Sequence, residues 1–230
     1  MNDDLRFNNW ETLNQDLISC RKCERLVAWR EDVAVTKRKA YRDLPYWGKP
    51  VPGFGDLNAR ILVVGLAPGA HGSNRTGRMF TGDASGDFLF PALYRFGFAN
   101  QADAGERGDG LQLKDIFITA VGRCAPPQNK IKSGEIQNCL PYLKAEISLF
   151  SNIQGMIALG GIAHQHLFKI GGYTKDKSKS KFGHGAFVQE INKPWLLASY
   201  HPSRQNTQTG RLTVEMFDQI WQKAQSLLVW

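Results

Sequence analysis

The stretch RILVVGLAPGAHGSNRTGRMFTGD, residues 60–83, decides the fold of this 230-residue chain. It opens with RILVVGL, residues 60–66, an apolar run rich in β-branched residues that predicts a buried strand. A glycine-rich loop follows up to residue 83, and a helical pattern covers residues 85–97 although Pro91 weakens it. A buried strand that leads through a loop into a helix is typical of α/β proteins with a parallel sheet.

Three further apolar runs predict strands, namely DIFITAV at 115–121, GMIAL at 155–159 and WLLASY at 195–200. Helical patterns occur at residues 134–150, with Ser133 as a candidate N-cap, from the third strand to about Phe168, and at residues 211–227. We therefore predict one α/β domain over residues 1–230, with three α/β/α layers and a central four-stranded, mainly parallel sheet. Residues 1–50 are expected to be a polar helical segment attached to this core.

The composition favours a basic globular protein with a polyanionic partner. The formal net charge is +8, and basic residues are dense at 21–49 and 169–181. Such charge suits nucleic acid, because neutralising phosphates releases counterions. No apolar run is long enough to cross a membrane, and the start MNDDLRFNNW does not resemble a secretory signal. We expect a cytoplasmic monomer without a membrane partner.

The chain has four cysteines, which are Cys20, Cys23, Cys124 and Cys139. Disulfides are disfavoured without an export signal, and a thioredoxin-like pair would follow a strand rather than precede the first one. Four thiolates fit either a structural zinc ion or an iron–sulfur cluster, and their spacing does not choose between them. Simple buried thiols remain the alternative.

Three motifs that carry polar residues follow predicted strands directly. Asp83 closes the glycine-rich loop, Asn129 lies in RCAPPQNK at 123–130, and His201 lies in ASYHPSRQNTQTGR at 198–211. The carboxyl ends of parallel strands meet at one edge of a sheet, where α/β proteins bind their ligands. We therefore expect these residues to share one cleft, with His201 presented rather than buried.

Each of these residues also has a structural interpretation. Phe80 could stack on a planar base or be an ordinary core residue, and Asp83 could orient water or cap the following helix. The amide of Asn129 could read a base edge or occupy a turn. The loop matches neither a Walker A nor a dinucleotide-binding pattern, and no hydrolase triad or zinc-deaminase pattern is present.

Taken together, the motifs resemble the uracil-DNA glycosylase superfamily and, within it, the iron–sulfur-bearing family 5. They are CxxC at 20–23, VPGFGD at 51–56, GLAPGAHGSNRTGR-x-FTGD at 65–83, RCAPP-x-N at 123–129, Cys139 and SYHPSRQNTQTGR at 199–211. Residues 67–70 offer no polar side chain where other families place an acid or amide, which matches family 5.

The resemblance implies an enzyme that removes uracil, and often hypoxanthine or xanthine, from DNA. It implies a 4Fe–4S cluster on Cys20, Cys23, Cys124 and Cys139. It also implies catalytic roles for Asp83, Asn129 and His201, and a stacking role for Phe80. We expect Gly65, Ala67, Gly69 and Asn129 to contact the base, and Ser203, Arg204, Gln205 and Asn206 to contact DNA. The alternatives are a non-catalytic damaged-DNA-binding module and an iron–sulfur redox protein, although no flavin or nicotinamide pattern supports the latter.

Overall fold

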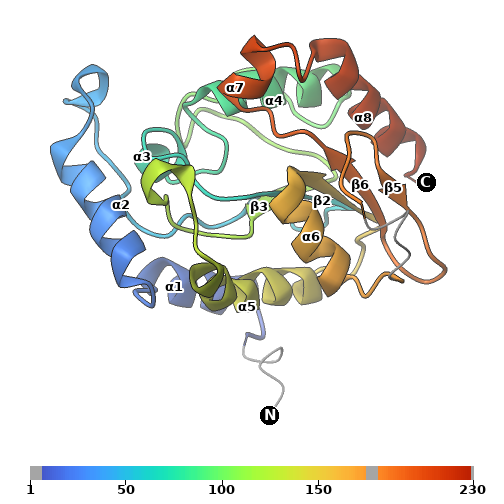
Figure 1. The fold of residues 1–230 in the computed structure, drawn as a ribbon, viewed down its shortest axis with the longest axis horizontal. Coiled ribbons are helices and arrows are strands. Elements are labelled where there is room, and N and C mark those ends of the chain that lie inside the picture. Colours follow the sequence, from blue (N-terminus) through green and yellow to red (C-terminus); the bar gives the residue numbers. More distant parts are fainter. Residues whose placement is uncertain (1–6, 175–180, 229–230) are drawn as a thin grey trace.

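The computed structural model describes residues 7–174 and 181–228, and within them a six-stranded sheet lies between helices (Figure 1). The four central strands are β2 (Ile61–Gly65), β3 (Ile116–Ala120), β4 (Gly155–Leu159) and β6 (Trp195–Ser199). These four strands are parallel to one another and follow the order β3-β2-β4-β6. The predicted α/β class and the four apolar strands are confirmed. Residues 175–180, which are part of the second basic stretch, lie outside the described residues.

The predicted four-stranded sheet is wrong in its strand number, because two short strands extend it. β1 (Phe54–Gly55) pairs antiparallel with β3, and β5 (Phe187–Val188) pairs antiparallel with β6. Two residues are too short to show a period-two pattern, and β1 lies inside a Gly- and Pro-rich stretch. Short antiparallel strands cover both edges of the parallel sheet, which limits pairing with other chains.

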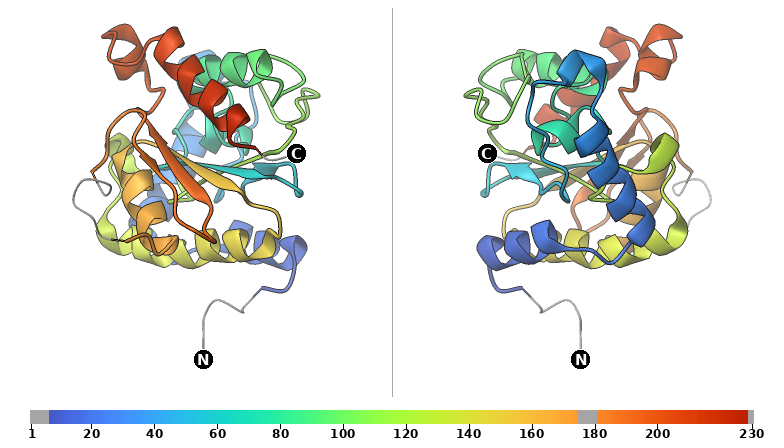
Figure 2. Two further views of the ribbon diagram at one scale, coloured as in Figure 1. Left: turned by 90° about the vertical axis from the view of Figure 1, so that its right-hand side faces the viewer. Right: turned by 90° about the vertical axis from the view of Figure 1, so that its left-hand side faces the viewer.

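The sheet lies between two separate helical layers (Figure 2). Alternating side chains of the central strands point into the two cores on its opposite faces. Ile61 and Val63 point into a core shared with α4 (Ala84–Arg95) and α8 (Val214–Ser226). Leu62 and Val64 point into the opposite core, beneath α5 (Ser133–Leu149) and α6 (Gly161–Ile170). Because both faces are covered, all five residues of each central strand are buried. The three-layer prediction is therefore correct.

The N-terminal segment is helical, as predicted, over α1 (Trp10–Ser19), α2 (Glu24–Thr36) and the short η2 (Lys39–Tyr41). α1 buries Leu13 and Leu17 against α5, where the Tyr142 hydroxyl donates to Asp16 Oδ2 at 2.7 Å. The remaining short helices are α3 (Ser73–Thr76), η3 (Pro127–Asn129) and α7 (Arg204–Gln208).

Two predicted helix starts move in the structure. Lys132 rather than Ser133 is the N-cap of α5, since the Glu135 carboxylate accepts from the Lys132 N–H at 2.7 Å. The last helix begins at Val214, because the Thr213 hydroxyl caps it by accepting from the Met216 N–H. Among the described helices, none is both long and apolar enough to cross a membrane.

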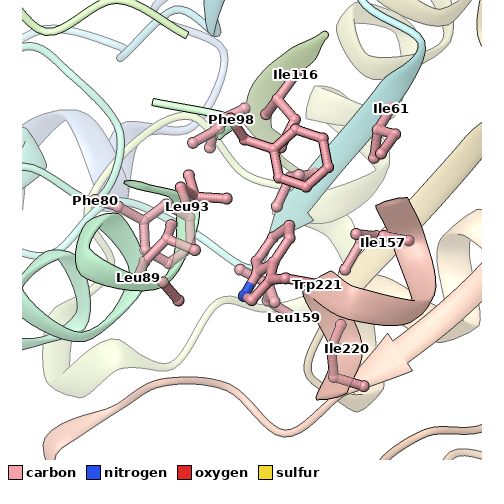
Figure 3. Packing of buried hydrophobic residues seen from close by; sticks show 14 of the residues in the cluster. Ile61, Phe80, Leu89, Leu93, Phe98, Ile116, Ile157, Leu159, Ile220 and Trp221 are labelled. Atoms are coloured by element: carbon pink, nitrogen blue, oxygen red, sulfur yellow. The ribbon is translucent and has the colours of Figure 1, made fainter. Parts of the chain in front are cut away.

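Trp221 anchors the core between the sheet and α8 (Figure 3). Its side chain is 0% exposed, and its ring meets Phe217 edge-on at 5.5 Å and Phe98 at 6.2 Å between centroids. A residue of this size at this depth contributes a large share of the stability of a domain.

We predict that Trp221→Ala lowers the free energy of unfolding by about 3–5 kcal/mol through lost burial and a residual cavity. Urea denaturation followed by far-UV circular dichroism measures the loss. Val35→Ala is the control, since Val35 is 81% exposed and its truncation should stay within about 0.5 kcal/mol. Equal midpoints for the two variants would contradict this assignment of the core.

Candidate functional site

The ring of Phe80 lies directly over the end of β2. A Cβ on Gly65 would be 2.8 Å from Phe80 Cζ, so only glycine leaves room for the ring there. Phe80 is 8% exposed and has φ 53°, a left-handed conformation that costs a side-chain-bearing residue roughly 1–2 kcal/mol. Such strain persists only where the surroundings impose it, and it is often found at functional sites.

An ion pair and a close backbone contact hold the Phe80 turn in place. Arg78 donates from Nε to Thr81 Oγ1 at 2.9 Å, and its two terminal nitrogens donate to Asp109 at 2.8 and 2.6 Å. The Phe80 carbonyl packs closely on Gly86. A Cβ at Gly86 would lie 1.8 Å from that oxygen, so only glycine fits there. The loop is therefore held by the Arg78–Asp109 ion pair and by the close contact of the Phe80 carbonyl with Gly86 of α4.

His201 follows β6 and stacks on Phe80, with ring centroids 5.8 Å apart and planes 29° apart. Its carbonyl accepts from the Asn206 amide at 2.8 Å, which fixes the turn that carries the imidazole. The prediction that His201 is presented rather than buried needs correction, because the residue is half-buried against Phe80. Burial lowers the pKa of His201 to about 4, so the ring is neutral near pH 7.

Asp83 divides its carboxylate between two environments. Oδ1 caps α4 by accepting from the N–H groups of Ser85 at 3.0 Å and Gly86 at 3.3 Å. Oδ2 lies against the glycine-rich loop, where a Cβ on Gly69 would be 2.9 Å and one on Gly72 2.0 Å away. Burial raises the pKa of Asp83 above its ordinary value of 3.8. The capping interpretation is correct, and one oxygen still faces the loop.

In the loop after β2, backbone carbonyls accept hydrogen bonds from the protein, whereas several backbone N–H groups have no hydrogen-bond partner among the described residues. Its carbonyls are engaged, since Leu66 O accepts from the Gly122 N–H at 2.8 Å and Gly69 O accepts from Asn74 N–H at 3.0 Å. The N–H groups of Ala67, Gly69 and Ala70 make no hydrogen bond to any described residue. This turn therefore offers unpaired backbone donors beside Asp83.

Asn129 makes no described contact with Phe80, Asp83 or His201. It ends η3 beyond β3, is exposed, and has φ 57°. Its side chain makes no hydrogen bond to a described residue, whereas Arg25 holds the same loop by donating to Lys130 O at 2.9 Å. Asn129 therefore lies beyond the end of β3, the strand next to β2, and its side-chain amide is free to bind a ligand.

The four residues predicted to contact DNA form the start of α7. Ser203 is the N-cap and accepts from the Asn206 N–H at 3.4 Å. Arg204 and Gln205 are exposed, whereas the Asn206 side chain is engaged with the His201 carbonyl. Two of the four are therefore free to reach a ligand, and the other two build the turn.

All four cysteines line one pocket between the N-terminal helices and α5, and all four are free thiols. Burial raises the pKa of Cys124 to about 12 and also raises that of Cys139, because it disfavours the thiolates. Within residues 7–174 and 181–228, no three His, Cys, Asp or Glu side chains form a group that could hold a metal ion. The cysteines share a pocket without the close grouping that one ion requires.

Two buried arginines complement this pocket, and the sequence interpretation missed both. Arg30 is 2% exposed and donates from Nη1 to Cys124 Sγ at 2.9 Å. Arg123 also lines the pocket; it pairs with Glu146, while its buried Nε and Nη1 have no partner in the described structure. Buried cations need nearby negative charge, so this donor set fits a thiolate-bound group. The position of Arg123 directly before Cys124 was the available signal.

A short chain of contacts joins the cysteine pocket to the glycine-rich loop. The Asn74 amide is fully buried and donates to Arg30 O at 3.2 Å, while the Asn74 N–H donates to Gly69 O. Farther along, the Trp47 N–H donates to Arg75 O at 2.8 Å. The N-terminal segment therefore packs on the same loop that carries Phe80.

Comparison with known proteins identifies the family. The model of the uracil DNA glycosylase superfamily matches residues 52–225. A type-5 uracil-DNA glycosylase of Mycobacterium leprae is 50% identical over 216 residues, 94% of each chain. One from Thermus thermophilus is 50% identical over 217 residues, 94% of this chain and 97% of the relative. A type-4 uracil-DNA glycosylase of Pyrobaculum aerophilum is 35% identical over 164 residues, 69% of this chain and 74% of the relative. With this site and these relatives, the chain belongs to the uracil-DNA glycosylase superfamily and, within it, to the type-5 family.

Proposed function

We propose that this protein is a DNA repair glycosylase that hydrolyses the bond between uracil and deoxyribose and leaves an abasic site. The observation that carries the proposal is the stacking of Phe80 on His201 over the end of β2, with Asp83 Oδ2 against the glycine-rich loop that follows this strand. The related proteins are named as uracil-DNA glycosylases, which supports the same substrate.

Binding requires the damaged nucleotide to leave the base stack, at a cost of a few kcal/mol that is least for mismatched bases. Phe80 supplies an aromatic surface that replaces part of the lost stacking, in the way aromatic side chains hold single bases. The turn that carries Phe80 is already fixed by Arg78, so the backbone beneath the ring is in place before the base arrives.

The leaving base takes the electron pair of the C1′–N bond, and its negative charge spreads onto the base oxygens. Neutral His201 donates a hydrogen bond to this charge, and the open N–H groups of Ala67, Gly69 and Ala70 provide further donors. A neutral imidazole suits this role because burial prevents its protonation near pH 7.

The sugar becomes cationic at C1′ as the bond breaks. The negative charge of Asp83 stabilises that cation, and Oδ2 orients the water whose oxygen adds to C1′. The proton of that water passes to the Asp83 carboxylate or to solvent. Asn129, open at the end of β3, would contact the base or help to hold it.

Residues 66–70 place no polar side chain against the base, so few groups enforce one hydrogen-bonding pattern. We infer that the site also accepts other deaminated bases, such as hypoxanthine and xanthine. Outside the pocket, Arg204 and Gln205 on α7 would contact the DNA next to the vacated position, while Ser203 and Asn206 shape that turn. The protein would act as a monofunctional glycosylase and a monomer.

Cys20, Cys23, Cys124 and Cys139 would hold a 4Fe–4S cluster in their shared pocket, with Arg30 and Arg123 balancing its negative charge. When bound, such a cluster supplies iron–thiolate bonds that cross-link the N-terminal helices to the loop after β3 and to α5. We assign it no step of base removal.

We predict that the protein converts a duplex with one uracil into an abasic duplex, which alkali then cleaves. His201→Ala should slow single-turnover cleavage about 10²–10³-fold through loss of a donor to the leaving base. His166→Ala, on α6, is the control and should keep the wild-type rate. Binding of the uracil duplex without an alkali-sensitive site would favour a non-catalytic sensor and contradict the proposal.

We predict an acidic limb in the rate profile that belongs to Asp83. The pKa of this carboxyl is raised above 3.8, so activity should fall as the pH drops through that raised value. Asp83→Asn keeps a capping oxygen for α4 but no charge, so it should lower the rate about 10²–10⁴-fold and remove the limb. His201→Gln should keep the limb, and its disappearance there would reassign the ionisation to His201.

We predict that the purified protein contains about four iron atoms per chain and absorbs visible light, as 4Fe–4S proteins do. Cys139→Ser should lose that absorbance and lower the midpoint of thermal unfolding, because one of the cross-links is removed. About one zinc ion per chain and no visible band would instead support the zinc alternative that spacing left open.

A further inference from the structure

Five exposed basic residues belong to two segments that pack beside the glycine-rich loop. They are Arg38, Lys39, Arg42, Lys49 and Arg107, and we call this set the basic strip. None of them forms an ion pair with another described residue, whereas many other arginines of the chain do. Unpaired cations on one surface favour a partner that carries repeated negative charge.

The turn that carries the first three members is held rigidly. Lys37 donates from Nζ to Arg42 O at 3.1 Å and to Leu44 O at 2.8 Å, which closes the turn after α2. The Arg75 guanidinium lies 4.4 Å from the centroid of the Tyr41 ring and fastens the turn to α3. The exposed cations therefore stand on a fixed support rather than on a free loop.

The same segment is docked on the candidate site. The Gly48 N–H donates to Asn74 O at 3.0 Å, and the Tyr46 hydroxyl contacts His71 Nδ1 at 3.0 Å. Burial, with the positive charges of Arg38 and Arg75, lowers the pKa of His71, so the field of the strip reaches the loop. The basic strip and the pocket thus share one support.

The Trp47 ring brings together two members of the basic strip, Lys49 and Arg107, that are far apart in the sequence. Lys49 Nζ lies 5.7 Å and the Arg107 guanidinium 5.1 Å from the Trp47 ring centroid. The ring itself covers Gly77, where a Cβ would be 2.9 Å from Trp47 Cδ2. Cations from two segments therefore converge on one aromatic surface beside the loop.

The strip and α7 lie on the same side of the molecule. In Figures 1 and 2 the turn after α2 and α7 both rise above the sheet, with α3 of the glycine-rich loop between them in Figure 1. A DNA duplex carries one negative charge per about 1.7 Å of its axis, so a double helix lying across the loop would meet both.

We propose that the basic strip is a second DNA contact, which binds phosphates flanking the damaged nucleotide on the side away from α7. This inference rests on the proposed function in one respect, namely that the polyanion bound by the strip is DNA. The basic strip would contact only the sugar–phosphate backbone of the DNA. It would therefore add affinity for any duplex and hold the duplex over the pocket without reading its sequence. Base selection stays with the pocket.

The test measures binding to an undamaged fluorescent duplex of about 20 base pairs by anisotropy, at several salt concentrations between roughly 50 and 200 mM. Arg38→Ala combined with Arg42→Ala should weaken binding and reduce the slope of log K against log salt by about 2, since each phosphate contact contributes about 0.9. The control pair is Lys114→Ala with Lys169→Ala, which removes the same charge from exposed sites just before β3 and at the end of α6.

The proposal expects the control pair to keep the wild-type slope, and thermal unfolding should show that both double variants are folded. An unchanged slope for the Arg38 and Arg42 variant, or equal losses in both pairs, would overturn it. Because the duplex is undamaged and nothing is cleaved, this result is independent of the glycosylase activity. A protein without that activity could still bind through the strip, and an active one could lack it.

Discussion

The ring of Phe80 rests on the bare backbone of Gly65, and this contact sets the geometry of the whole candidate site. It requires a glycine at the last position of β2 and a left-handed turn at Phe80. His201 reaches the same ring from β6, which is separated from β2 by β4. Parallel strands make this possible because their carboxyl ends lie side by side. The Phe80 ring and the His201 imidazole thereby meet over the end of β2, and Asp83 Oδ2 lies against the loop that follows the same strand.

The N-terminal segment gives this geometry a second support. Arg30 bonds Cys124 through its side chain and Asn74 through its carbonyl, while Asn74 fixes the Gly69 carbonyl. The cysteine pocket is therefore only a few contacts away from the loop that would bind the base. The conformation of the residues around the cysteines and that of the glycine-rich loop therefore depend on each other, although the two sites share no chemistry. A cluster held by these cysteines, as proposed above, would therefore help to fix the geometry of the candidate site.

Much of the fold could be predicted because the four central strands are short, apolar and separated by turn-rich loops. β1 could not, since Phe54–Gly55 is too short to show a pattern and owes its existence to pairing with β3. At the site, strand-end placement predicted Asp83 and His201, but the half-burial of His201 comes from its contact with Phe80, which lies 121 positions earlier in the chain. The ion pair of Arg78 with Asp109 and the role of Arg30 likewise depend on distant segments meeting, which local patterns do not encode.

A structure of the protein bound to a duplex with 2′-fluoro-2′-deoxyuridine would test the central claim most directly, because the fluorine slows cleavage and keeps the base in place. We predict an everted uracil stacked on Phe80, with its oxygens near His201 and the loop amides and with Asp83 Oδ2 facing C1′. A uracil that remains in the duplex, or one that occupies a pocket away from Phe80, would contradict it.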